Sequence, residues 1–288
     1  MDLQKLGVMK LVIDSNALQT EKLRAFLAKS KQNFAVLPDF AGMEAYKGDP
    51  LKTVYKSMAI VSDFPNQVII LKGSAKVCGL SGRRKGLQRR LVDDKQTAEF
   101  AEHTRALRLA EAGDIRLQGQ IRELGVFANE HLKKMRDESE NIRGAIEELG
   151  THFSKEERSQ LRVGKQYAPE LVDKVVRIVM EMAALAFRDS PLIRRPPSYQ
   201  ELPNTFIFRV MFANFLHSIR RFSQGGFRDL SSDKLGNDFV DMMFVAYGSY
   251  FDGVMSSDKN VQYMFSKTCL LLSALLNAEI PCIKGLRK

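Results

Sequence analysis

The chain has 288 residues, of which 44% are hydrophobic and 27% are charged. This length can bury a substantial core, and this composition excludes a chiefly disordered or fibrous chain. The net charge is +10, from 44 Lys and Arg against 34 Asp and Glu. A basic protein attracts polyanions, so nucleic acid, an anionic membrane or an acidic protein are the partners to consider.

The first third of the sequence alternates short β-branched runs with segments of helical spacing. The apolar run at residues 10–13 predicts a buried strand, and it ends at Asp14. The other predicted elements are a helix at 20–30, a strand at 34–38, a helix that begins at Pro38 and carries Glu44, a helix at 50–63 and a strand at 67–73. This alternation predicts an α/β fold with a central, mostly parallel sheet.

The character of the sequence changes after residue 75. A dense basic cluster at 81–90 is followed by a charged region at 93–148 whose composition favours two or more helices with polar faces. A strong helix is predicted at 168–187, and three prolines within 190–198 end it. We therefore expect residues 76–199 to form a large helical insertion that is basic at its start.

The last third returns to the α/β pattern. Amphipathic helices are predicted at 204–222 and at 236–251, the second capped by Asn237 or Asp238. A short strand follows at 252–258, then a helix at 259–276 and a last strand at 279–283. Residues 1–75 and 200–288 are thus predicted to form one discontinuous domain.

Histidine and cysteine spacing excludes the common zinc sites. The three cysteines (Cys78, Cys269 and Cys282) have no CxxC partner, and the four histidines show no HExxH spacing. The cysteines are expected to be reduced and mostly buried. Any metal ligands must then be oxygens, which favours Mg²⁺ or Mn²⁺. No apolar run fits a signal peptide or a membrane span, so we expect a cytoplasmic protein without a membrane partner.

Acidic residues fall where predicted strands end. Asp14 follows a predicted strand and Asp258 ends one. Glu44 lies early in a helix after a strand, and Asp238 and Asp241 lie three residues apart on one helical face. Open parallel sheets bind ligands beyond the carboxyl ends of their strands. A cluster of carboxylates there would repel itself unless a hard cation neutralised it, and such a cation can act on phosphate esters. Helix capping is the alternative for Asp14, Asp238 and Asp258, and plain solvation for Glu44.

Three segments resemble the signatures of PIN-domain nucleases. LVIDSNAL resembles the opening strand and its Asp, VLPDFAGMEAYKG the helix with a Glu, and NDFVDMMFVAYGSYFDGVMSSDKNV the last two acidic positions. By this resemblance Asp14, Glu44, Asp241 and Asp258 match the catalytic, metal-binding quartet. Asp238 is a rival to Asp241 as the third metal ligand, and the choice between them stays open.

The resemblance covers residues 8–75 and 200–285 and implies a fold and an activity. The fold is a three-layer α/β/α domain, and the activity is phosphodiester hydrolysis with Mg²⁺ or Mn²⁺. Ser15, Asn16 and Ser256 would orient the carboxylates. The compact members of the family are much shorter than this chain, so the insertion at 76–199 leaves substrate and partners open.

Basic side chains are the candidates for holding a nucleic-acid backbone, with a solvated loop as the alternative. They are Arg83, Arg84, Lys85, Arg89, Arg90, Arg194, Arg195, Arg220 and Arg221. The first hypothesis is an endoribonuclease of the toxin, defence or RNA-processing type, with RNA favoured over DNA. The alternatives are a DNA-directed flap-type nuclease, a non-catalytic nucleic-acid-binding or assembly subunit, and a helical scaffold protein. A homo-oligomer, or an inhibitory or assembly protein partner, also stays open.

Overall fold

The computed structural model describes residues 7–163, 168–188, 193, 197–222 and 231–284. Four strands form one parallel sheet in the order β3-β2-β1-β4. They are β1 (Met9–Ile13), β2 (Asn33–Leu37), β3 (Val68–Ile70) and β4 (Gly253–Met255). The predicted α/β class and the parallel sheet are confirmed.

The central strands are buried on both faces, as parallel strands covered by helices must be. Val12 and Ile13 of β1 and Ala35 and Val36 of β2 are fully buried. Val12 sits opposite Val36 on one side and Val254 on the other. The continuous apolar runs that predicted these strands thus form the centre of the core.

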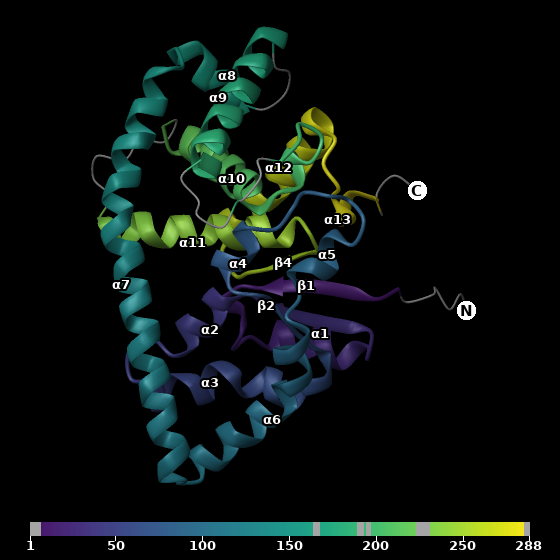
Figure 1. Ribbon diagram of the computed structural model, residues 1–288, viewed down its shortest axis with the longest axis vertical. Helices are drawn as coiled ribbons and strands as arrows, with labels where there is room; N and C mark the ends of the chain where they lie inside the picture. The colour runs from purple at the N-terminus through teal and green to yellow at the C-terminus, as the bar shows by residue number, and fades with distance from the viewer. Residues whose placement is uncertain (1–6, 164–167, 189–192, 194–196, 223–230, 285–288) are drawn as a thin grey trace.

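Helices lie on both sides of the sheet (Figure 1). α1 (Glu21–Lys29), α2 (Asp39–Ala45) and α3 (Pro50–Asp63) follow β1 and β2 on one side. α11 (Ser232–Gly248) and α12 (Lys259–Leu276) pack on the other side, where α11 contacts both β1 and β4. The architecture is compatible with three layers.

Residues 76–199 are helical over most of their described length. The helices are α4 (Ser74–Cys78), α5 (Leu87–Leu91), α6 (Asp94–Glu111), α7 (Ile115–Thr151), α8 (Lys155–Val163) and α9 (Pro169–Arg188). With 37 residues, α7 extends for about 55 Å along one side of the molecule, from α6 at the bottom of Figure 1 to α8 near the top.

The first half of the predicted insertion shares the core of the sheet. Phe100 and Leu107 of α6 and Ile121 and Ala128 of α7 belong to the same buried cluster as Val12. α8 and α9 instead pack on α10 (Phe206–Phe222), where a second cluster is rich in phenylalanine. The insertion therefore contributes to two cores.

Arg209 of α10 ties the last third of the chain together from inside. It is fully buried, and its guanidinium donates to Pro203 O, Ser249 O and Oγ, Asn204 Oδ1 and Glu279 O. These bonds use all five of its N–H donors. Because Ser249 lies just after α11 and shortly before β4, Arg209 fixes the approach to the last strand.

Three predictions for the last third are wrong in detail. The strand predicted at 279–283 is instead the helix α13 (Pro281–Lys284), because Pro281 cannot donate to a strand ladder and is suited to a first helical turn. α11 is capped by Ser231, whose side chain accepts from Lys234 N. Asp238 and Asp241 therefore lie in the middle of the helix. β4 ends at Met255, three residues before Asp258.

A helix that crosses a bilayer must be long and mostly apolar. Among the described residues, no helix is both long enough and apolar enough to cross a bilayer.

Candidate functional site

The candidate site lies where the winding direction of the sheet changes. From β1 the chain proceeds outward to β2 and β3, and then returns to place β4 on the opposite side of β1. In open parallel sheets, the crevice at such a point, beyond the carboxyl ends of the strands, is where ligands bind. Asp14 directly follows β1, and its amide donates to Met255 O at the end of β4. Asp14 thus stands at this point.

Asp14 is 2% exposed, and short hydrogen bonds fix its carboxylate. Asn16 Nδ2 and Ser256 Oγ each donate to Oδ2 at 2.6 Å, and Ser15 Oγ lies 3.3 Å from Oδ1. Burial raises the pKa of Asp14, while the bonds from Ser256, Ser15 and Asn16 act in the opposite direction. The three residues predicted to orient the carboxylates are those that contact Asp14.

Asn16 and Ser256 also join the ends of β1 and β4. Asn16 Oδ1 accepts from Ser257 N at 2.8 Å and from Ser257 Oγ at 2.9 Å. Ser256 Oγ accepts from Asp258 N at 3.0 Å while it donates to Asp14. A single network therefore connects Asp14 to the loop that carries Asp258.

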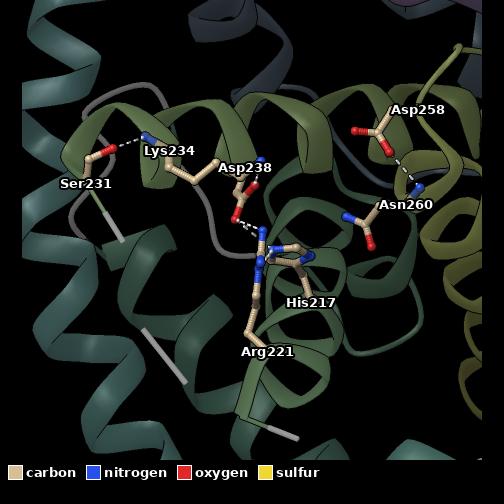
Figure 2. Close-up of polar contacts among 7 residues, drawn as sticks. All are labelled: His217, Arg221, Ser231, Lys234, Asp238, Asp258 and Asn260. Atoms are coloured by element: carbon tan, nitrogen blue, oxygen red, sulfur yellow. Dashed lines mark hydrogen bonds and ion pairs between the residues drawn. The ribbon is translucent and has the colours of Figure 1, made fainter. Parts of the chain in front are cut away.

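Asp258 is the N-cap of α12, which was the alternative role considered for it. Its Oδ1 accepts from Asn260 N at 2.6 Å (Figure 2). The side chain is half-buried. Capping uses one carboxylate oxygen and leaves the other to face a ligand.

Burial and neighbouring carboxylates both act on Asp241 of α11. Burial, followed by repulsion from Asp14, Asp258 and Asp238, raises the pKa of Asp241 from 3.8 to about 8, and Lys234 offsets this only in part. A carboxyl group behaves in this way when it is buried near other carboxylates and nearby cations do not compensate. The structure thus brings Asp14, Asp241 and Asp258 into one electrostatic neighbourhood.

Asp238 belongs to a separate ionic cluster (Figure 2). Its carboxylate lies 2.7 Å from Arg221, 3.0 Å from Lys234 and 3.2 Å from His217. Burial works against the charged form, but the hydrogen bond and charge of His217, with Lys234 and Arg221, outweigh it and lower the pKa of Asp238 to about 2. Between the two rivals for the third acidic position, Asp241 is the one that forms no ion pair with the residues that the structure describes.

Glu44 is not joined to the three aspartates by any described interaction. It is half-buried in α2, and it is not among the groups that shift the pKa of Asp241. Asp39 lies two residues beyond the end of β2, close to the position that Asp14 has directly after β1, and Asp39 Oδ2 accepts from Ser74 N at 2.6 Å. The signal for Asp39 was present in the sequence, as an Asp directly after a predicted strand, but Glu44 was preferred by resemblance.

The donor set suits a hard divalent cation in its chemistry, since all three groups are carboxylates and one holds a proton for lack of a counter-charge. In the part of the chain that the structure describes, no group of three or more His, Cys, Asp and Glu side chains is placed so that it could hold a metal ion. Asp14 is turned toward Asn16 and Ser256, and Asp258 toward Asn260. Binding of one cation by all three carboxylates would therefore require these side chains to rearrange.

The basic cluster at residues 81–90 divides into exposed and internally bonded side chains. Arg83, Lys85 and Arg89 are exposed. Arg90 donates to the carbonyl oxygens of Ser81, Arg83 and Lys85 and so holds its own loop together. Only the exposed side chains have charge to offer a phosphate.

Two more of the predicted basic residues also have partners within the chain. Arg84 donates to Asn277 O at 3.0 Å and lies 3.5 Å from Glu279. The Arg220 guanidinium stacks 4.1 Å from the ring centre of Tyr263. Together with Arg221, which pairs with Asp238, they serve packing first. Arg194 and Arg195 lie outside the described residues.

No family model matches the chain, and neither the curated proteins nor the solved structures contain a match. These comparisons identify no relative, so the function is inferred from the residues of this chain alone.

Proposed function

We propose that this chain is a metal-dependent nuclease that hydrolyses phosphodiester bonds, with Asp14, Asp241 and Asp258 as its carboxylates and Mg²⁺ or Mn²⁺ as its cofactor. The observation that carries the proposal is the raised pKa of Asp241, at about 8, beside two other aspartates at the change of winding direction. The most favoured substrate is RNA, cleaved internally.

The fold is proposed to be of the PIN type. Support comes from the three sequence segments that resemble the signatures of PIN-domain nucleases, and from where their acidic residues lie. Asp14 follows β1, Asp241 lies on the helix that precedes β4, and Asp258 follows β4. Glu44 is the remaining member of the expected quartet. It is a catalytic residue only if substitution of Glu44 reduces phosphodiester cleavage.

Each part of the site has a proposed task. A bound divalent cation supplies a more acidic water and neutralises charge that develops on the phosphate. Asp241 would bind the cation as a deprotonated carboxylate, because a nearby positive charge would offset the burial and the repulsion that favour its protonated form, and its proton would pass to solvent. Asn16 and Ser256 hold Asp14 in a fixed orientation throughout. Arg83, Lys85 and Arg89 bind backbone phosphates without reading sequence.

The test is a cleavage assay on labelled single-stranded RNA, single-stranded DNA and duplex DNA, each with Mg²⁺, Mn²⁺ or EDTA. We expect cleavage that needs the metal and that falls by about 100-fold in Asp241→Asn and Asp14→Asn, the upper end of what loss of a group orienting a metal costs. Asp173→Asn, an exposed residue of α9, is the matched control and should cleave as the wild type does. Cleavage that persists in both site variants would refute the assignment.

A non-catalytic nucleic-acid-binding or assembly subunit is the second candidate. The observation in its favour is that no described group of side chains is arranged to hold a metal ion. It predicts that the wild type binds RNA and cleaves none of the three substrates with either metal.

A further inference from the structure

A cavity of about 440 Å³ opens beside the carboxyl ends of β2 and β3. Its wall begins at Leu37 and Ile70, the last residues of these strands, and it is closed by α2, α3, α6 and α7. In Figure 1, α2, α3 and α6 lie below the sheet, beside the lower part of α7. The volume lies within the range of about 300–1,000 Å³ that small-molecule sites occupy.

The cavity is adjacent to the carboxylate site across the sheet. β2 neighbours β1, and β3 is one strand further out. Strands are spaced by about 4.8 Å, so the ends of β2 and β3 lie roughly 5–10 Å from the strand that carries Asp14. A nucleotide whose phosphate is held near Asp14 could therefore place a base in this cavity.

The walls suit a flat ring. Met58, Phe100 and Leu124 supply apolar surface, and the rings of Phe100 and His103 lie with their centres 6.1 Å apart. Planar heteroaromatic rings bind between aromatic and apolar side chains of this kind.

The polar groups of the cavity favour a ligand that donates hydrogen bonds and carries no negative charge. Asp39, Gln96, Glu99, His103 and Tyr46 line it, Gln96 and Glu99 being exposed, and no Lys or Arg side chain lines the described wall. Burial lowers the pKa of His103, which leaves its imidazole neutral. The Tyr46 hydroxyl and His103 Nε2 are 3.5 Å apart, longer than a normal hydrogen bond, so both can still bond to a ligand.

We propose that this cavity is a base-recognition pocket that takes an amino-bearing nucleobase (adenine, cytosine or guanine) in preference to uracil. Carboxylate oxygens accept from the exocyclic amino group of cytosine, and glutamine amides pair with adenine. Glu99 and Gln96 provide these two functions. The inference rests on the proposed nuclease function for its biological role, but binding of a base does not depend on metal or on Asp241.

The test measures binding of free nucleosides in EDTA, so that it is independent of catalysis. Adenosine, cytidine, guanosine and uridine would be titrated into the full chain and followed by ligand-observed NMR. We expect uridine to bind more weakly by about tenfold, the value of one lost base-edge contact. Equal binding of uridine would overturn the preference for an amino group.

Gly42 offers a variant that fills the cavity. It lines the pocket from α2, and a Cβ atom added there would meet no atom within 4 Å. Gly42→Leu should therefore fold and should abolish nucleoside binding. Gly119→Leu, on α7 and equally unobstructed, is the matched control and should bind as the wild type does. Thermal melting of both variants confirms that they fold.

The outcomes separate the two proposals. Nucleosides that bind the wild type and Gly119→Leu but not Gly42→Leu establish the pocket, even if no RNA is cleaved. Nucleosides that bind none of the three proteins, or that bind Gly42→Leu unchanged, overturn it, even if RNA is cleaved.

Discussion

Two aspartates on one face of α11 have opposite pKa shifts. Asp238 lies beside His217, Arg221 and Lys234, which lower its pKa to about 2. For Asp241, three residues later, burial and the other carboxylates, Asp238 included, raise the pKa to about 8. The same residue type, nearly one turn apart, is thus a fixed anion at one position and a protonated acid at the other.

The difference shows what makes a carboxylate available for chemistry. The charge of Asp238 is already neutralised by partners in the chain, so it has little to gain from a cation. Asp241 gains much, because a cation would replace both its proton and the repulsion from Asp14 and Asp258. Buried charge with partners is structural, and buried charge without them indicates a functional site.

Removal of the Asp238 carboxylate should have the largest effect on stability. Asp238→Asn leaves the Arg221 guanidinium, whose side chain is 23% exposed, without its ion pair. Breaking a buried pair from one side costs about 3 kcal/mol, so we expect the free energy of unfolding to fall by about that amount. Urea denaturation at pH 7 measures it, with Asp173→Asn as the control.

The same pair predicts a loss of stability in acid. Because the folded pKa of Asp238 lies below 3.8, its contribution is present above pH 3.8 and is lost as the pH falls toward 2. If Asp238→Asn unfolds at the same urea concentration as the wild type at pH 7, the ionic cluster around Asp238 stabilises the fold no more than a surface ion pair does.

Asp241→Asn should change the pH dependence of stability in the opposite direction. The folded pKa of about 8 lies above the ordinary 3.8, so the wild type binds more protons folded than unfolded. The contribution of Asp241 to stability is therefore greatest below pH 3.8 and declines as the pH rises to about 8. In Asp241→Asn this decline should be absent, which denaturation at a series of pH values would detect. Parallel curves for the two proteins would contradict the raised pKa.

Metal binding provides a direct check on the same group. If a cation displaces the Asp241 proton, binding of Mn²⁺ at pH 7 releases about one proton. Calorimetry in two buffers of different ionisation enthalpy counts that proton. Asp241→Asn should release none, and equal release from both proteins would place the titrating group elsewhere.

Local patterns predicted what depends on neighbours in sequence. The helix limits 50–63 and 259–276 agree with α3 and α12, since Pro50 favours a first turn and Asp258 caps the second helix. The strand before Asp14 was also predicted, because a β-branched apolar run has few alternatives.

Tertiary contacts decided the rest. Nothing between residues 217 and 238 of the sequence signals that His217 and Arg221 will meet Asp238 across two helices. The predicted start of this helix, at residue 236, is wrong because α11 is capped by Ser231. The packing of α6 and α7 into the sheet core also depends on contacts between distant segments. The sequence thus limits the set of carboxylates that could share a site, but it does not determine which of them do.

The smallest expected effect on stability concerns Lys234, one of the cations that pair with Asp238. Lys234 lies 3.0 Å from Asp238, but its side chain is 46% exposed, twice the value for Arg221. Water and salt screen such a charge, so Lys234→Gln should cost no more than about 0.5 kcal/mol and less at high salt. Arg221→Gln should cost more, because it empties the more buried position. If the two variants lose equal stability in urea, burial does not determine the strength of these two ion pairs. The difference between Asp238 and Asp241 would then depend only on how many charges lie near each carboxylate.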